Sequence, residues 1–180
     1  MDYQTPDSVE GSSLATGVQW SGMYNAALAI HSVIRWIILL FALLAIARAA
    51  SGVATGRQWK RADDLGSGFL IRALDLQMLI GLIVYFGLSP ITWEGMRHMG
   101  AAMANAGLRY FTVEHPVGMI IAVTLAHVGE RRIRGATDSA RRHRNALIFF
   151  TLALIVILVS IPWPGRPVIG RPLLRPFFGG

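Results

Sequence analysis

The sequence predicts an all-α integral membrane protein, a bundle of four transmembrane helices. Of its 180 residues, 53% are hydrophobic and only 15% are charged, a composition that a soluble domain of this size would not keep in solution. The chain also contains four apolar runs, each close to the roughly 20 residues that a helix needs to cross a bilayer. These runs cover residues 26–47, 69–88, 110–128 and 146–163.

The four runs leave little chain for a separate soluble domain. We expect a membrane bundle over residues 24–163, a polar external tail over residues 1–23 and an extended Arg-Pro-rich tail over residues 164–180. Asn25 stands just before the first apolar run and is a suitable helix cap. Any functional site should therefore lie inside the bundle or at its rim.

The distribution of basic residues predicts the orientation. Ten of the 17 Lys and Arg residues lie in the connections after the first and the third run, whereas the other connection and the C-terminal tail hold five. The positive-inside rule then places the two basic loops in the cytoplasm and both termini outside, in the periplasm if the membrane is a bacterial inner membrane. The net charge of +7 follows from this topology and from attraction to anionic lipid, and does not indicate nucleic acid as a partner.

Local signals place the helix ends. Gly52 and Gly56 should end the first helix, and Asp63 and Asp64 favour the start of the second, where carboxylates stabilise the helix dipole. Ser89-Pro90 should close the second helix.

The long connection between the second and third runs contains Met96, Met99 and Met103 at spacings of three and four. This spacing predicts one short amphipathic helix on the membrane surface. Together with His98 the thioethers could also bind Cu(I), but packing against the bundle or the interface is the expected role, with no metal bound.

Two signals describe the C-terminal tail. Arginine precedes proline three times, which favours an extended conformation close to polyproline II. A stiff chain loses little entropy on docking, so the tail could strap a neighbouring membrane protein; the alternative is a tail resting on lipid headgroups. Its partner-binding residues would be Arg166, Arg171, Arg175, Phe177 and Phe178.

Four ionisable residues lie at matching depths in the first and third runs: His31, Arg35, Glu114 and His115. His31 and Arg35 share a helix face because they are four residues apart. At a rise of 1.5 Å per residue, both histidines lie about 10 Å inside the outer helix ends and could face each other. Arg35 could pair with Glu114, or either could orient a ligand.

These four residues have three interpretations. The first, which we expect, is a polar cluster that locks the helices, with no cofactor. The second is haem b held between His31 and His115. The third is a pocket for a quinone or a lipid headgroup. A single haem near the outer face could not carry electrons across about 30 Å of hydrocarbon without a partner centre.

A second group lies toward the basic loops: Arg72 and Asp75 in the second run, and His127 and Glu130 at the end of the third. Complementary pairs on neighbouring helices fix register, which apolar contacts in lipid do poorly. We expect a structural polar cluster here. Gly118 and Ala122 form a small-xxx-small pair that permits close helix packing.

The sequence contains no cysteine, and no pattern of a nucleophile with its base, a phosphate loop or a metal motif. We therefore expect a non-catalytic protein. Its small bundle and two tails favour an accessory or structural subunit of a larger bioenergetic membrane complex, photosynthetic or respiratory.

Several segments resemble a small bacterial four-helix membrane family whose members are labelled cytochrome b-like. The resemblance extends over residues 26–172 and implies the four-helix fold. It also implies for His31, Arg35, Glu114 and His115 whatever role the family gives these positions. The segments are residues 31–36 (HSVIRW), 76–82 (LQMLIGL), 113–116 (VEHP), 161–164 (IPWP) and 170–172 (GRP).

Overall fold

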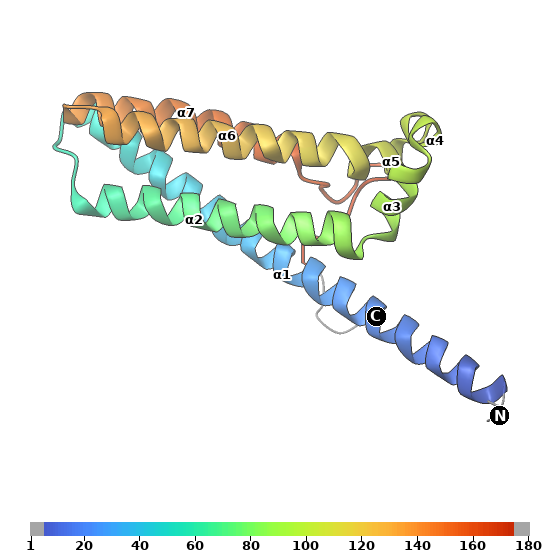
Figure 1. The fold of residues 1–180 in the computed structure, drawn as a ribbon. Helices are drawn as coiled ribbons and strands as arrows, with labels where there is room; N and C mark the ends of the chain where they lie inside the picture. The colour runs from blue at the N-terminus through green and yellow to red at the C-terminus, as the bar shows by residue number, and fades with distance from the viewer. Residues whose placement is uncertain (1–5, 175–180) are drawn as a thin grey trace.

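The computed structural model describes residues 6–174, and the side chains of residues 20–174, as a bundle of long helices (Figure 1). No strand occurs in this part of the chain. The predicted all-helical class is therefore confirmed for it. The long helices are α1 (Pro6–Thr55), α2 (Arg61–Ile83), α6 (His115–Gly135) and α7 (Ser139–Ser160); the short ones between α2 and α6 are α3 (Pro90–Arg97), α4 (Met99–Ala104) and α5 (Ala106–Arg109).

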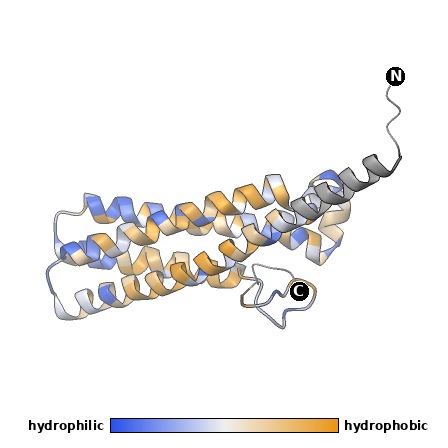
Figure 2. Cartoon of the chain, turned by 90° about the horizontal axis from the view of Figure 1, so that it is seen from below, coloured by the Kyte–Doolittle hydropathy of each residue, from blue (hydrophilic) through white to orange (hydrophobic). Residues whose placement is uncertain are grey.

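Four helical segments are long and apolar enough to cross a membrane: Trp20–Thr55, Arg61–Leu88, Ala106–Gly135 and Ser139–Val159. Figure 2 shows hydrophobic residues along the middle of the long helices and hydrophilic residues toward the two ends of the bundle, many of them at the end where α1 meets α2 and α6 meets α7. We call that end the basic-loop end. The opposite end is the α3–α5 end. The segments support the predicted multi-pass membrane protein.

The order of the helices around the bundle sets up the site. α1 packs against α2 and α7, and α6 packs against the same two helices. α1 and α6 therefore lie diagonally, with the bundle axis between them. Side chains from these two helices can meet only across the centre of the bundle.

Small residues let the helices approach closely. Ala42, Ala122, Ala126 and Ala153 are almost fully buried among larger side chains such as Phe150. A Cβ on Gly118 would overlap the side chain of Ser160 on α7. The predicted small-xxx-small pair on α6 is thus in close contact with α7, as packing in lipid requires.

The helix ends agree with the sequence at the basic-loop end. α1 ends at Thr55, and Gly56 follows with a φ of 66°, a left-handed conformation that favours glycine. α2 begins after Lys60, whose backbone N–H donates to the Asp63 side chain at 2.9 Å. At the other end Ser89 caps α3 and accepts a hydrogen bond from the Thr92 amide.

Two expectations about the α3–α5 end were wrong. α1 begins at Pro6, so Asn25 lies inside a helix and does not cap one, and residues 6–23 are helical. Proline is well suited to a first helical position, and no later proline interrupts α1. The methionine-containing connection forms three short helices broken at His98 and Asn105, not one, with Met96, Met99 and Met103 partly exposed.

Two π-helical turns interrupt the regular geometry on either side of these short helices. The turn η1 (Val84–Leu88) follows α2, and η2 (Tyr110–Glu114) precedes α6. A π turn inserts an extra residue into the helix and is found often at functional sites. Both turns lie at the α3–α5 end.

The C-terminal segment, residues 161–174, does not have the extended conformation that the sequence predicted for the tail. It turns at Gly165 and Val168, which have φ values of 85° and 67°. The Arg171 amide then donates to the Pro162 carbonyl at 3.0 Å, which closes the segment on itself. It lies at the α3–α5 end, against the bundle (Figure 1). Arg175, Phe177 and Phe178 lie outside the described residues.

Candidate cofactor site

A cavity of about 450 Å³ lies within the α3–α5 half of the bundle. Its walls are mostly apolar and come from α1, α2, α6 and both π turns, and the end of α7 and the C-terminal segment complete them. This volume lies in the range of small-molecule and cofactor sites. The polar side chains that line it include His31, Arg35, Gln77, His115 and Arg171.

His31 and His115 meet across this cavity. They come from the diagonal helices α1 and α6, and their ring centroids are 6.4 Å apart with planes at 65°. The sequence predicted that the two imidazoles could face each other, and the geometry agrees. No other pair of described histidines forms a ring contact.

The end of α7 orients the His115 ring. α7 stops at Ser160 because Ile161 and Pro162 leave the helix, so the Ser160 carbonyl has no partner along the helix. The Nδ1 of His115 lies 2.8 Å from that oxygen, and the Tyr110 hydroxyl also donates to it at 2.6 Å. A carbonyl can only accept, so Nδ1 carries the proton and Nε2 keeps a free lone pair.

The His31 ring has a different environment. Its Nδ1 is buried and has no hydrogen-bond partner among the described residues. Gly81 on α2 leaves room for the ring, since a Cβ there would lie 3.4 Å from Cε1. Gln77 holds the backbone beside it by donating to the His31 carbonyl at 2.9 Å. The neighbouring residues therefore hold the ring in place but leave its Nδ1 without a hydrogen bond.

Other polar atoms at this cavity also lack partners within the described chain. They are the Nε of Arg35, the Oε1 of Gln77 and the Oγ1 of Thr112. Buried polar groups are nearly always hydrogen-bonded, so each exception requires an explanation. Four unpartnered atoms at one cavity, counting His31 Nδ1, are what a site for a polar ligand would present.

Arg35 does not pair with Glu114, contrary to one sequence-based expectation. Its guanidinium donates to the Leu173 carbonyl and, at 3.2 Å, to Ser32. Glu114 instead binds Arg109 at 2.7 Å. The π turn explains this, because its hydrogen-bonding period places residues five apart on one face and turns Glu114 outward.

The cavity is consequently rich in positive charge. Arg171 lies over the Phe111 ring, with its guanidinium carbon 4.7 Å from the ring centroid. Within the described chain, no aspartate or glutamate lines the cavity. Arg35 and Arg171 thus present two cations without a carboxylate to neutralise them. Such an arrangement favours a ligand that carries negative charge.

The C-terminal segment covers part of the cavity. The Leu173 carbonyl accepts from Ser32, Arg35 and Trp36, the last at 3.0 Å from the indole Nε1. Pro172 belongs to the cavity wall. Of the predicted tail residues, Arg171 thus contacts this chain's own cavity, and Arg166 lies over Tyr110 at 5.5 Å.

The second predicted cluster is only partly assembled. His127 on α6 contacts Asp75 on α2 at 2.7 Å, which links the two helices as predicted. Glu130 instead binds Arg134 on its own helix at 2.7 Å. Arg72 has no ion pair within the described chain and lies back over Gly68.

Two further histidines, His98 and His143, lie outside the cavity. His98 approaches Glu94 at 3.9 Å and is largely exposed, and no described group of three His, Asp or Glu residues could hold a metal ion. His143 lies within α7 and is fully buried beside Trp59, with ring centroids 4.8 Å apart.

Sequence reasoning missed the groups that shape the cavity. Ser160 acts through its carbonyl, for which the Pro162 helix stop was the only available signal. The two π turns leave no pattern in a single sequence. Comparisons of the chain with protein families, curated proteins and solved structures found no match.

Proposed function

We propose that this protein is a membrane electron-transfer subunit that binds one haem b between His31 and His115. The observation that carries the proposal is the pair of imidazoles 6.4 Å apart across an apolar cavity. Two metal–nitrogen bonds of about 2 Å each, plus the radius of each ring, span a similar distance. The residues present therefore fit this group.

The hydrogen bond of His115 supports the same assignment. Histidines that bind a metal almost always donate their other ring nitrogen to a carbonyl, carboxylate or water. The bond to the Ser160 carbonyl leaves Nε2 of His115 as the available ligand atom. The Nδ1 of His31 has no such partner within the described chain.

The charges at the cavity support it further. Haem carries two propionate carboxylates, and the cavity presents Arg35 and Arg171 without an acidic neighbour in its described wall. Charge-assisted hydrogen bonds from guanidinium groups suit carboxylates well. Bound haem would supply one-electron redox chemistry, while the apolar wall excludes water.

The second part of the proposal is that the protein works within a larger membrane assembly. The cavity lies at one end of the bundle, and His127 at the other end already binds Asp75. One haem near one face cannot pass electrons across about 30 Å of hydrocarbon alone. The protein would therefore exchange electrons with other subunits of a bioenergetic complex in a bacterial inner membrane.

A quinone headgroup is the runner-up occupant. Gln77 Oε1 and His31 Nδ1 are buried without partners and could accept hydrogen bonds from a quinol. Two cationic side chains at the wall could bind a quinone carbonyl, although they suit a carboxylate better.

The test is a reduced-minus-oxidised absorption spectrum of the full chain, purified in mild detergent from haem-replete cells. We expect a Soret and an alpha band that His31→Ala and His115→Ala both abolish and that His98→Ala leaves intact. No band in the wild-type protein would exclude the haem. Extraction of a stoichiometric quinone from the same sample would then establish the runner-up.

The assembly is tested separately by removing residues 175–180. This deletion keeps Arg171 and the Leu173 carbonyl, so the contacts of the cavity should survive. We expect the truncated chain to keep its spectrum but to leave the complex during native purification in mild detergent. Unchanged co-purification would count against a role of this terminus in assembly.

A further inference from the structure

A second cavity, of about 380 Å³, lies between α1 and α2 at the basic-loop end. Its walls include Phe41, Leu44, Leu65 and Phe69, and the rings of Phe41 and Phe69 contact with centroids 4.2 Å apart. Leu44, Leu65 and Phe69 are 49%, 57% and 42% exposed. They lie on spanning helices, so the cavity is a groove that opens where lipid surrounds the bundle.

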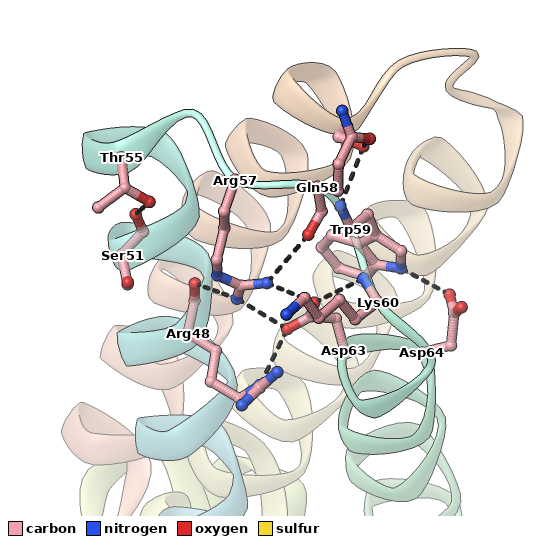
Figure 3. Close-up of polar contacts among 10 residues, drawn as sticks. Arg48, Ser51, Thr55, Arg57, Gln58, Trp59, Lys60, Asp63 and Asp64 are labelled. Carbon is pink, nitrogen blue, oxygen red and sulfur yellow. Dashed lines mark hydrogen bonds and ion pairs between the residues drawn. The ribbon is translucent and has the colours of Figure 1, made fainter.

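A polar cluster borders this groove (Figure 3). Asp63 is buried, with 2% of its side chain exposed, and binds two guanidinium groups. Arg57 contacts it through both terminal nitrogens at 2.7 and 2.9 Å, and Arg48 through Nε at 2.9 Å. The hydrogen bond to Asp63 raises the pKa of Arg57 above its ordinary value.

One carboxylate thus serves two arginines, and the cluster keeps a positive charge. The terminal nitrogens of Arg48 form no hydrogen bond within the described chain, and 44% of its side chain is exposed. Arg48 lines the groove. Trp59 is also in the wall, and its indole donates a hydrogen bond to Asp64 at 2.7 Å. Tryptophan is enriched at the interface between membrane and water, where its ring contacts apolar groups and its N–H finds a polar partner.

We propose that this groove binds one anionic phospholipid, with an acyl chain between α1 and α2 and its phosphate on the terminal nitrogens of Arg48. The apolar walls suit hydrocarbon, and the free guanidinium edge suits a phosphate oxygen pair. A free phosphate would leave the apolar groove unfilled. The site is independent of the haem proposal, since it shares no residue with the α3–α5 cavity.

The test measures lipid binding to the full chain by native mass spectrometry in mild detergent, with phosphatidylglycerol and phosphatidylcholine as probes. We expect phosphatidylglycerol to bind about fivefold more tightly, as one arginine near a membrane surface contributes about 1 kcal/mol. Arg48→Gln should remove that preference. The matched control Arg141→Gln, an exposed cation at the same end, should keep it.

A second variant fills the groove without touching the polar cluster. Gly66 lines the groove and a Cβ there would have no atom within 4 Å, so Gly66→Leu begins its side chain in open space and should extend into the groove. We expect it to weaken binding of both lipids. Gly22→Leu, which is equally uncrowded and lies outside the groove, should not.

Three results would overturn the proposal. These are equal affinity for both lipids in the wild type, equal effects of Arg48→Gln and Arg141→Gln, and undiminished binding to Gly66→Leu. Inorganic phosphate and the water-soluble headgroup glycerophosphoglycerol serve as competitors. Displacement of the lipid by inorganic phosphate alone would assign the site to a free anion instead.

Discussion

The Asp63 cluster and the His31–His115 cavity both place ionisable groups in apolar helices, at opposite ends of the bundle. Each Asp63 oxygen accepts two hydrogen bonds, from Arg48, Arg57 and the Lys60 amide. At the cavity, by contrast, His31 Nδ1 and Arg35 Nε are buried without partners. A polar cluster whose hydrogen bonds are all made within the chain holds helices together. A cluster with buried polar atoms that lack partners is suited to a ligand that the chain itself does not supply.

This difference predicts that the Asp63 cluster contributes most to stability. Asp63→Asn removes the charge that two guanidinium groups share and should lower the free energy of unfolding by about 3 kcal/mol, because a hydrogen bond to a charged group contributes about 1.5–3 kcal/mol and this carboxylate is only 2% exposed. Thermal unfolding in detergent measures this. Glu94→Gln changes a carboxylate that is 57% exposed and serves as the control. A loss no larger than that of the control would contradict the prediction.

The second-largest loss of stability should follow from disturbing the contact between α6 and α7 beside the cavity. Gly118→Val brings a side chain into Ser160 and displaces the carbonyl that orients His115. Overpacking of this kind costs about 1–3 kcal/mol. The same substitution at Gly22, where nothing lies within 4 Å, should not destabilise the protein.

A double variant tests whether the overlap between the new side chain at position 118 and Ser160 causes the loss of stability, or whether valine acts in another way. Ser160→Ala removes the overlapping hydroxyl but keeps the carbonyl, so it should restore part of the stability that Gly118→Val loses. Absence of any recovery would mean that the close approach of Ser160 is not the cause. The haem spectrum of the double variant then reports whether the orientation of His115 has recovered.

The sequence predicted the fold better than the site. Apolar runs and basic loops predicted four helices, because length and hydropathy alone decide what can cross a bilayer. The meeting of His31 and His115 followed from their matched depths. The partner of Glu114 could not be predicted from depth, because a π turn pairs this residue with Arg109, five residues away. The C-terminal turns depend on long-range contacts with Arg35 and Trp36, which single-sequence patterns do not encode.

The smallest expected effect on stability is at His31, and it sharpens the comparison most. Because its Nδ1 has no partner, replacing the ring by an apolar side chain of similar size removes a burial cost and breaks no hydrogen bond. His31→Leu should therefore change the free energy of unfolding of the haem-free protein by less than about 1 kcal/mol, or raise it.

His115→Leu is the matched comparison. It removes one of the two donors to the Ser160 carbonyl and should cost about 1 kcal/mol in the same haem-free preparation, because the Tyr110 hydroxyl still donates to that oxygen. Both variants should nevertheless lose the haem spectrum completely. A residue whose removal leaves the empty protein stable but abolishes ligand binding is kept for function and not for folding. If His31→Leu instead destabilises the haem-free protein as much as Asp63→Asn does, the cavity histidines lock helices, and the distinction between the two ends of the bundle fails.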